Sequence, residues 1–428
     1  MIQVEQRLPL LQMIPLSLQH LFAMFGATVL VPFLFKVNPA TSLLMNGIGT
    51  LIYIFMTRGR IPAYLGSSFA FIAPVFAVVA DPSLGGYAAA QGGFIAFGIF
   101  FIIISRIIRS YGTDWLDIIF PPAAMGAIVM VIGLELGPVA TNMAGLTGNL
   151  LAEQNIPVNP AILVSMFTLL VTILGSVLFK RFLATIPVLI GVVSGYLLAL
   201  SIGLVNLEAV SQAPWFEVPT LYAPTFSIHA ILMIAPAFLV VLAEHIGHLV
   251  VTGNIVERDL IHDPGLDHSL LGDGLSNVVS GLVGATPNTT YGENIGVMAI
   301  TKVFSVWVIG GAAVIAIAIS FVGKFAALVR SIPVPVMGGV SILLFGVIAA
   351  AGIRMLIERK VDYTKSRNLI LTSIVLIAGV SGATLKIGAV ELKGMALGTV
   401  VSIAISLLFA LFDRMGWMNQ EQNPSVER

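Results

Sequence analysis

The chain has 428 residues, of which 57% are hydrophobic and 10% are charged, whereas about a quarter of the residues in an ordinary soluble domain are charged. Charge-free runs such as residues 160–179 and 184–206 can each cross a bilayer, which takes about 20 apolar residues. No polar stretch is long enough for a separate soluble domain, and the absence of cysteine excludes disulfides and thiolate metal sites. We therefore predict an all-α polytopic membrane protein that lies in the lipid bilayer and does not bind nucleic acid.

Fourteen apolar stretches follow one another along the chain and predict fourteen transmembrane segments. They lie near residues 14–35, 40–57, 64–80, 88–108, 120–140, 160–179, 184–206, 227–251, 270–285, 287–301, 304–323, 331–353, 368–385 and 394–412. The third and tenth are short and interrupted by Gly, Ser or Pro, and the ninth is weak. The first follows a single arginine, Arg7, and lacks a small-residue cleavage site, so we expect a retained span and no cleaved signal peptide.

The distribution of basic residues predicts the orientation of these segments. With a cytoplasmic N-terminus, sixteen of the 21 Lys and Arg residues fall on the cytoplasmic side and five fall outside. This is the asymmetry that the positive-inside rule requires. The five outside are Lys36, Lys324, Arg330, Lys386 and Lys393. Fourteen segments then leave both termini in the cytoplasm.

The two halves of the chain repeat a short pattern. Residues 120–128 align without a gap on residues 332–340, so that Pro121, Met125 and Gly126 match Pro333, Met337 and Gly338. These patterns open the fifth and twelfth segments, which are seven apart. Because seven is odd, the repeat predicts two halves of seven segments that are inverted in the membrane, with the third segment corresponding to the tenth.

Residues 286–302 do not have the pattern of a lipid-facing helix. Pro287 and two glycines interrupt them, and they carry the carboxylate of Glu293. Irregular backbone at membrane depth is tolerated only where it is buried in protein or lines a cavity, and an ionisable residue there indicates a functional site. We expect a short β-strand before Gly292 and a helix from Gly292 onward, with a matching strand in the third segment.

Several motifs in this order resemble those of the nucleobase–ascorbate transporter family. The signature of this family begins with Gln, Glu or Pro, continues as N-x-G-x4-T and ends with Arg, Lys or Gly. In this chain it is matched by Glu293, Asn294, Gly296, Thr301 and Lys302. A Glu in the first position resembles the bacterial uracil permease branch, whereas xanthine and urate carriers usually have Gln. The resemblance extends to three other stretches, residues 19–28, 64–71 and 243–249.

This resemblance implies a secondary active transporter of the bacterial cytoplasmic (inner) membrane, with no enzyme activity, no cofactor and no metal. It further implies a core domain formed by residues 1–110 (segments 1–4) and 216–325 (segments 8–11). A gate domain would comprise residues 111–215 (segments 5–7) and 326–415 (segments 12–14), followed by a cytoplasmic tail at 416–428. The core would move against the gate by alternating access, and the gate would form a homodimer.

The eighth segment contains a cluster of ionisable residues. Glu244 and His248 are four residues apart and share one helix face, whereas His245 points about 100° away. One reading is a Glu–His pair that only joins helices. Another is a metal site, since His245 and His248 are three apart, but the order E-H-x-x-H differs from H-E-x-x-H and a third ligand is missing.

The predicted substrate site combines residues from both broken segments. A flat, neutral pyrimidine such as uracil needs acceptors for its N–H groups, donors for its carbonyl oxygens and an aromatic face. Glu244 and Glu293 supply acceptors, the backbone amides around Phe69 and Gly292 supply donors, and the ring of Phe69 or Tyr291 supplies the face. The resemblance implies the same assignment. Glu293 could alternatively cap its own helix start.

Proton coupling would give the uptake of a neutral base a driving force, because a proton brings charge across the membrane potential. The candidates to carry the proton are Glu244, His248 and Glu293, together with His20, which the repeat places near the level of Glu244. Glu135 is a further intramembrane carboxylate to which no role is assigned.

Three other functions remain open from the sequence. The first is uptake of xanthine or another purine by a permease of the same family. The second is an anion exchanger or channel with the same inverted architecture, which would require a cation where the two helix starts meet. The third is an intramembrane metalloenzyme built on the histidines of the eighth segment.

Overall fold

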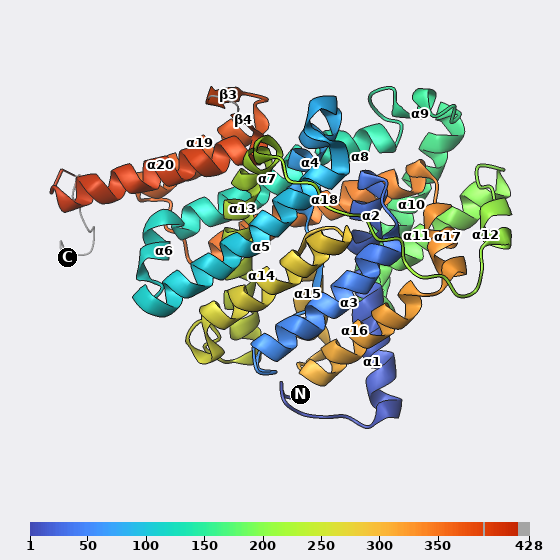
Figure 1. Ribbon diagram of the computed structural model, residues 1–428, viewed down its shortest axis with the longest axis horizontal. Helices are drawn as coiled ribbons and strands as arrows, with labels where there is room; N and C mark the ends of the chain where they lie inside the picture. The colour runs from blue at the N-terminus through green and yellow to red at the C-terminus, as the bar shows by residue number, and fades with distance from the viewer. Residues whose placement is uncertain (388–389, 418–428) are drawn as a thin grey trace.

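The computed structural model describes residues 1–387 and 390–417, most of which belong to a bundle of tilted helices (Figure 1). The helices of the first half are α1 (Leu10–Ala23), α2 (Phe25–Phe35), α3 (Pro39–Met56), α4 (Ile72–Ala80), α5 (Gly86–Tyr111), α6 (Asp114–Ile119), α7 (Pro122–Glu135), α8 (Gly137–Met143), α9 (Leu150–Glu153), α10 (Val158–Leu178), α11 (Pro187–Ser201) and α12 (Glu208–Gln212). Those of the second half are α13 (Ile228–Val256), α14 (Leu266–Val283), α15 (Gly292–Thr301), α16 (Val306–Ser320), α17 (Gly323–Arg330), α18 (Val334–Glu358), α19 (Ser366–Val380) and α20 (Gly394–Arg414).

Four short strands and four short helical turns complete the described part of the chain. The strands are β1 (Leu65–Ser67), β2 (Asn288–Thr290), β3 (Thr384–Ile387) and β4 (Val390–Lys393), and the turns are η1 (Phe69–Phe71), η2 (Pro82–Leu84), η3 (Arg181–Thr185) and η4 (Ile261–Gly265). β1 pairs with β2 and β3 with β4, both antiparallel. Most of the predicted tail at 416–428 lies outside the described residues.

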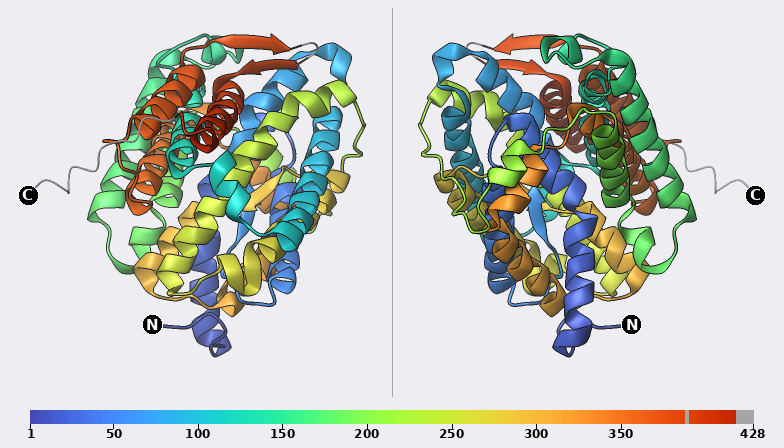
Figure 2. Two further views of the ribbon diagram at one scale, coloured as in Figure 1. Left: turned by 90° about the vertical axis from the view of Figure 1, so that its left-hand side faces the viewer. Right: turned by 90° about the vertical axis from the view of Figure 1, so that its right-hand side faces the viewer.

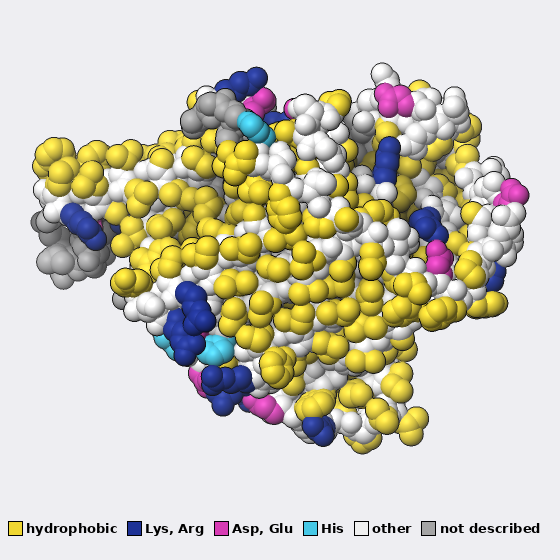
Figure 3. All heavy atoms as spheres, in the orientation of Figure 1, with side chains coloured by type: hydrophobic (Ala, Val, Ile, Leu, Met, Phe, Trp, Pro, Cys, Tyr) yellow, Lys and Arg dark blue, Asp and Glu magenta, His cyan; other side chains and the backbone are white. Residues whose placement is uncertain are grey.

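The described helices are those of a multi-pass membrane protein. Within the described residues, seven helical stretches are long and apolar enough to cross a membrane, or eight if α1 and α2, which meet at a bend of 42°, form one span. Shorter apolar helices occur at residues 69–80, Pro187–Ser201, Val306–Ser320 and Ser366–Val380. Hydrophobic side chains cover the middle of the molecular face in Figure 3, and charged side chains gather along its edges. Such an apolar surface is compatible with lipid. The polar backbone groups of these helices are compatible with lipid as well, because they are paired within each helix.

Local sequence explains where several helices begin. Asn38 caps α3 by accepting a hydrogen bond from the N–H of Ala40 at 3.0 Å, and Pro39 occupies the first helical position, where its missing N–H costs nothing. Ser305 caps α16 in the same way through the N–H of Trp307 at 3.2 Å.

Every predicted segment contains a helix, and the strands expected in the third and tenth segments are confirmed as β1 and β2. The prediction for the thirteenth segment was wrong at its end. It was expected to continue to residue 385, but α19 ends at Val380 and a β3–β4 hairpin follows. The alternation of apolar and charged residues from Thr384 to Lys393 has the period of a strand, which hydropathy alone does not distinguish from a helix end.

The helices pack in two groups that each combine both halves of the chain. In one group α14 packs against α3 and α5, α16 against α1 and α3, and α13 against α5. In the other, α18 packs against α7, α8 and α10, and α19 against α7 and α20. α13 also contacts α7 and α20, and α2 contacts α11 and α18, so these helices join the two groups.

The two ends of the bundle carry different features (Figure 2). The β3–β4 hairpin lies at one end and the N-terminus at the other. The N-terminal segment runs beside the start of α16, where Ile2 and Val303 form a parallel bridge. There Glu5 forms an ion pair with Arg258, which follows α13.

Candidate functional site

The two broken segments meet inside the bundle as a small antiparallel crossing. Leu65 pairs with Thr290, Gly66 with Thr289 and Ser67 with Asn288. Each strand leads directly into a helix, β1 into η1 and α4, and β2 into α15. The pairing satisfies backbone groups that no water could reach, while the first N–H groups of each helix start have no partner within their own helix.

Gly66 allows the two segments to approach closely. A Cβ atom at this position would lie 2.3 Å from the ring of Tyr291, so only glycine fits beneath that ring. The Tyr291 hydroxyl donates a hydrogen bond to the carbonyl oxygen of Ser67 at 2.9 Å, and the side chain is 3% exposed. Tyr291 therefore holds the crossing together.

Phe69 differs from Tyr291 in its exposure. It lies at the start of η1, is only partly buried, and meets Phe345 of α18 edge to face with ring centroids 5.8 Å apart. Of the two aromatic residues predicted at the site, Phe69 is thus the one with an accessible ring. Its contact with Phe345 joins the two packing groups of helices at this point.

The Glu244–His248 face of α13 lies against the crossing. His248 Nδ1 lies 3.1 Å from Thr290 Oγ1, and a Cβ atom on Gly292 would lie 3.3 Å from His248 Nε2. Gly292 therefore lets α15 begin directly beside the imidazole. Glu244 and His248 are both partly exposed, unlike the fully buried His245 between them.

Glu293 brings a second carboxylate to the same place. It occupies the first turn of α15, is partly exposed, and lies close enough to Glu244 for a coulombic interaction between the two carboxylates. Among the described residues, no side chain donates a hydrogen bond to either carboxylate, so their oxygens are available to a ligand. A carboxylate in the first turn is also favoured by the helix dipole.

His20 contacts the residue next to Glu293. Its Nδ1 atom lies 3.0 Å from Nδ2 of Asn294, and both side chains are buried. This contact joins α1 to the first turn of α15. The repeat predicted that His20 lies near the level of Glu244. In the structure, the His20 ring contacts Asn294 of α15 and forms no hydrogen bond with Glu244.

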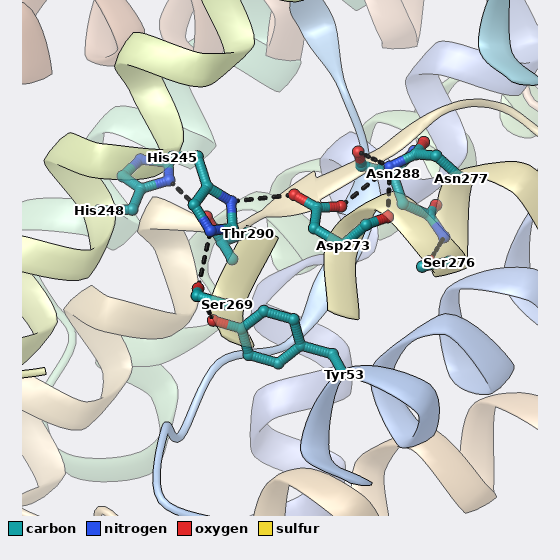
Figure 4. Close-up of polar contacts among 9 residues, drawn as sticks. All are labelled: Tyr53, His245, His248, Ser269, Asp273, Ser276, Asn277, Asn288 and Thr290. Carbon is teal, nitrogen blue, oxygen red and sulfur yellow. Dashed lines mark hydrogen bonds and ion pairs between the residues drawn. The ribbon is translucent and has the colours of Figure 1, made fainter. Parts of the chain in front are cut away.

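His245 belongs to a separate buried network that the sequence analysis missed (Figure 4). Its Nδ1 lies 2.9 Å from Asp273 Oδ2, and its Nε2 lies 2.7 Å from Ser269 Oγ, which in turn lies 2.6 Å from the Tyr53 hydroxyl. The signal was the spacing of Ser269, Asp273 and Asn277, which are four residues apart and therefore share one face of α14, although the predicted ninth segment began only at residue 270. Because His245 and His248 bond different partners, they do not converge on one metal.

Glu135 lies away from the crossing and has a structural contact. Its Oε2 accepts a hydrogen bond from the N–H of Met395 at 2.8 Å, at the start of α20. A side chain on Gly394 would collide with this carboxylate, and Gly394 has a positive φ of 55° that favours glycine. Glu135 therefore caps α20 from α7.

A bundle of apolar helices around two broken, polar segments defines a membrane transporter. The chain belongs to the permease family, whose sequence model matches residues 11–388. This confirms the family expected from the motifs, and the protein is a transporter and not an enzyme.

The chain is similar to two uracil permeases in sequence and to one solved transporter structure in fold. The chain is 63% identical to the uracil permease of Escherichia coli (strain K12) over 410 residues, covering 96% of this chain and 94% of the relative. It is 59% identical to the uracil permease of Paenibacillus larvae subsp. larvae over 419 residues, covering 98% and 99%. The transmembrane domain of the cyanobacterial bicarbonate transporter BicA has a TM-score of 0.61 at 14% identity, covering 98% of this chain and all of that chain, which shows similarity of fold alone.

Proposed function

We propose that this protein takes up uracil together with protons across the bacterial cytoplasmic membrane. The observation that carries the proposal is the pair of partly exposed carboxylates, Glu244 and Glu293, at the strand crossing, where the partly exposed Phe69 begins η1 and η1 contacts α13. The names of the two relatives at 63% and 59% identity support uracil as the substrate. An anion carrier would need a cation at the start of α15, where this chain has Glu293.

The chemistry of the crossing matches the functional groups of uracil. The two carboxylates accept hydrogen bonds from the ring N–H groups, and the free N–H groups at Phe69 and Gly292 donate to the carbonyl oxygens. Phe69 stacks on the base, while Tyr291 shapes the wall of the site from its buried position on Gly66. A site that pairs each polar group of its ligand rejects analogues that leave one group unpaired.

The membrane topology in this proposal has fourteen segments in two inverted sets of seven. α7 and α18 both begin directly after a proline, Pro121 and Pro333, which supports the alignment of the two halves. The antiparallel pairing of β1 with β2 also suits inverted halves. Lys386 and Lys393 lie in the hairpin at the end opposite the N-terminus, which supports cytoplasmic termini.

Transport would proceed by movement of a core against a gate. The core comprises residues 1–110 and 216–325 and the gate comprises 111–215 and 326–415, a division that the two packing groups of helices support. Substrate residues from α13, α15 and η1 would travel with the core past α18, which contributes Phe345. A homodimer formed through the gate would hold the gate still in the membrane.

Protons provide the driving force in this proposal. A neutral base carries no charge across the membrane, whereas one accompanying proton is worth about 2.3 kcal/mol per 100 mV. The sequence candidates for the proton, Glu244, His248, Glu293 and His20, all lie within the crossing or contact α15.

Uptake into reconstituted vesicles tests the proposal. Labelled uracil should accumulate faster as the external pH falls from about 8 to about 6, and a protonophore should abolish accumulation because the gradient collapses. Among unlabelled competitors, uracil should compete most strongly, and xanthine should compete weakly. Stronger competition by xanthine, or accumulation that requires sodium and survives the protonophore, would contradict the proposal.

A further inference from the structure

A buried carboxylate lies next to the proposed substrate site but does not belong to it. Asp273 of α14 and His245 of α13 are both fully buried, and Asp273 Oδ2 lies 2.9 Å from His245 Nδ1. The other oxygen, Oδ1, accepts a hydrogen bond from Asn277 Nδ2 at 2.9 Å. An unpaired charge at this depth is costly, so this pair must serve either the fold or transport.

The pair is connected toward one end of the bundle. His245 Nε2 lies 2.7 Å from Ser269 Oγ, and Ser269 Oγ lies 2.6 Å from the Tyr53 hydroxyl (Figure 4). Ser269 is in the first turn of α14 and Tyr53 is in the last turn of α3, so both lie near the ends of their helices. The close approach of these helices depends on Gly272, where a Cβ atom would lie 3.1 Å from Tyr53 Cα.

The pair is also connected to the substrate crossing. The side chain of Asn277 donates from Nδ2 to the carbonyl oxygen of Asn288 at 3.0 Å and accepts at Oδ1 from the N–H of Asn288 at 2.7 Å. Asn277 thus bonds both backbone groups of the first residue of β2. A change at Asp273 is passed through one side chain to the strand that precedes Glu293.

The carboxylates of the substrate site are poorly suited to hold the cotransported proton. In the proposed binding mode Glu244 and Glu293 accept hydrogen bonds from uracil, and an ionised acceptor makes the stronger bond. A proton on either group would weaken the bond to the substrate that it accompanies. The proton therefore needs a separate group close by.

We propose that the Asp273–His245 pair holds the cotransported proton, and that Ser269 and Tyr53 conduct it toward the end of the bundle where α3 ends. This inference rests on the proposed function and specifies its coupling site. With a neutral imidazole the pair carries one negative charge, and binding one proton converts it to an imidazolium–carboxylate pair with no net charge. Loading thus removes a net charge from the bundle interior.

The proton transfer balances within the chain of hydroxyl groups. In the unloaded pair His245 donates from Nδ1 to Asp273 and accepts at Nε2 from Ser269. On loading, Nε2 gains the proton and donates to Ser269 Oγ. On release, Nε2 returns it to Ser269, whose own hydroxyl proton passes to Tyr53. Tyr53 is fully buried, so the transfer of its hydroxyl proton requires a water molecule to enter where α3 ends. One proton leaves, and each hydroxyl regains the one it gave.

Other ionisable groups surround the pair. α13 contributes Glu244 and His248, both close enough to interact with its charges, and α3 contributes the Tyr53 hydroxyl. α5 faces His245 with the ring of Phe101, whose centroid lies 5.7 Å from that of the imidazole. Charge on Glu244 therefore acts on the pair directly, which links substrate binding to proton loading.

The experiment compares three activities of reconstituted protein. These are binding of labelled uracil, exchange of labelled for unlabelled uracil at equal pH, and uphill accumulation with uracil-driven proton entry followed by a pH dye. In Asp273→Asn, binding and exchange should stay within about threefold of the wild type. Accumulation and proton entry should fall at least about tenfold, because loss of a positioned proton-transfer group typically costs about 100-fold or more.

Two further variants sharpen the test. Tyr53→Phe keeps the ring and removes the hydroxyl, so it should slow accumulation and leave exchange unchanged. Ser280→Ala is the matched control, because Ser280 also lies on α14 and bonds Asn288 Nδ2 at 3.1 Å but is outside the proton chain. It should leave all three activities near the wild-type level.

The inference fails if Asp273→Asn accumulates uracil as the wild type does, or if binding and exchange fall together with accumulation. If Asp273→Asn does not fold, Tyr53→Phe and Ser269→Ala decide, and unchanged accumulation in both overturns the inference. Absence of uracil exchange by the wild type overturns the proposed function as well, so the two failures are distinguishable.

Discussion

Two regions of the molecule hold their helices together by different means. Around α13, α14 and β2, polar side chains bond across the interfaces; for example, the side chain of Asn277 bonds both backbone groups of Asn288. Around α7, α10 and α18, glycines bring the backbones together, and a Cβ atom on Gly339 would lie 2.2 Å from the carbonyl oxygen of Ser165. The first region also contains a close glycine contact, since a Cβ atom on Gly274 would lie 2.7 Å from the carbonyl oxygen of Gly98. What distinguishes the first region is its network of directional side-chain bonds.

This difference agrees with the division of work that we propose. Directional bonds select one arrangement and hold the substrate residues in position. Small residues on a helix surface allow close packing without fixing a particular partner, and they suit surfaces that move past one another in a membrane. In this proposal, the region with the network of polar bonds binds the substrate, and the region packed through small residues serves as the gate.

The largest loss of stability is expected where alanine replaces a glycine that lies against the backbone of a neighbouring helix. A Cβ atom on Gly338 would lie 2.4 Å from the N atom of Ala144, so Gly338→Ala should cost about 1–3 kcal/mol of stability and lower the thermal unfolding midpoint. Gly126→Ala should cost less, because its nearest neighbour is the flexible side chain of Leu356. Gly346→Ala, with nothing within 4 Å of its Cβ, is the control on α18.

Uracil binding separates a gate effect from a site effect in these variants. Folded Gly126→Ala and Gly338→Ala protein should bind uracil nearly as the wild type does while transport slows. Equal loss of binding and transport would show that these glycines line the site, and the comparison of the two regions would not hold.

A smaller effect is expected at the aromatic face. Phe69→Ala removes the accessible ring and should weaken uracil binding by about 0.5–1.5 kcal/mol beyond the loss of buried area. Phe69→Tyr keeps the ring and should bind nearly as well. Measured affinities for the two variants decide the point, and equal weakening in both would mean that ring stacking is not what Phe69 contributes.

The sequence predicted much of the fold and only part of the site. Hydropathy located the helices, and Gly and Pro in residues 286–302 predicted the strand–helix break, because these features are local. The partner of β2 followed from the repeat. Asp273 was missed because its role depends on contact with His245 across helices, and the cap that Glu135 provides for α20 depends on a residue 260 positions away.

The smallest effect is expected at the N-terminal segment, outside the membrane. The Arg258 guanidinium donates a hydrogen bond to Glu5 and lowers the pKa of that carboxyl. A lowered folded-state pKa stabilises the protein above the unfolded pKa of Glu, and that contribution is lost as pH falls through the folded pKa. The Glu5 side chain is 54% exposed and that of Arg258 is 36% exposed, so solvent screens the pair and Glu5→Gln should cost at most about 1 kcal/mol.

Thermal unfolding at two pH values measures this contribution. Wild type and Glu5→Gln should differ slightly at pH 7, and the difference should shrink as the pH falls below the ordinary carboxyl pKa of about 4 and through the lowered pKa of Glu5. High salt should reduce the difference at pH 7 because the pair is exposed to solvent. A difference that grows on acidification would reverse the sign of the assigned interaction.

The central claim is that Glu244 and Glu293 together bind uracil, and equilibrium binding of labelled uracil to purified protein tests it most directly. A hydrogen bond to a charged group contributes about 1.5–3 kcal/mol, so Glu244→Gln and Glu293→Gln should each weaken binding more than about tenfold. Glu135→Gln is the matched control, since this intramembrane carboxylate caps α20 away from the crossing, and its binding should match the wild type. Losses below about threefold at both Glu244 and Glu293 would contradict the account.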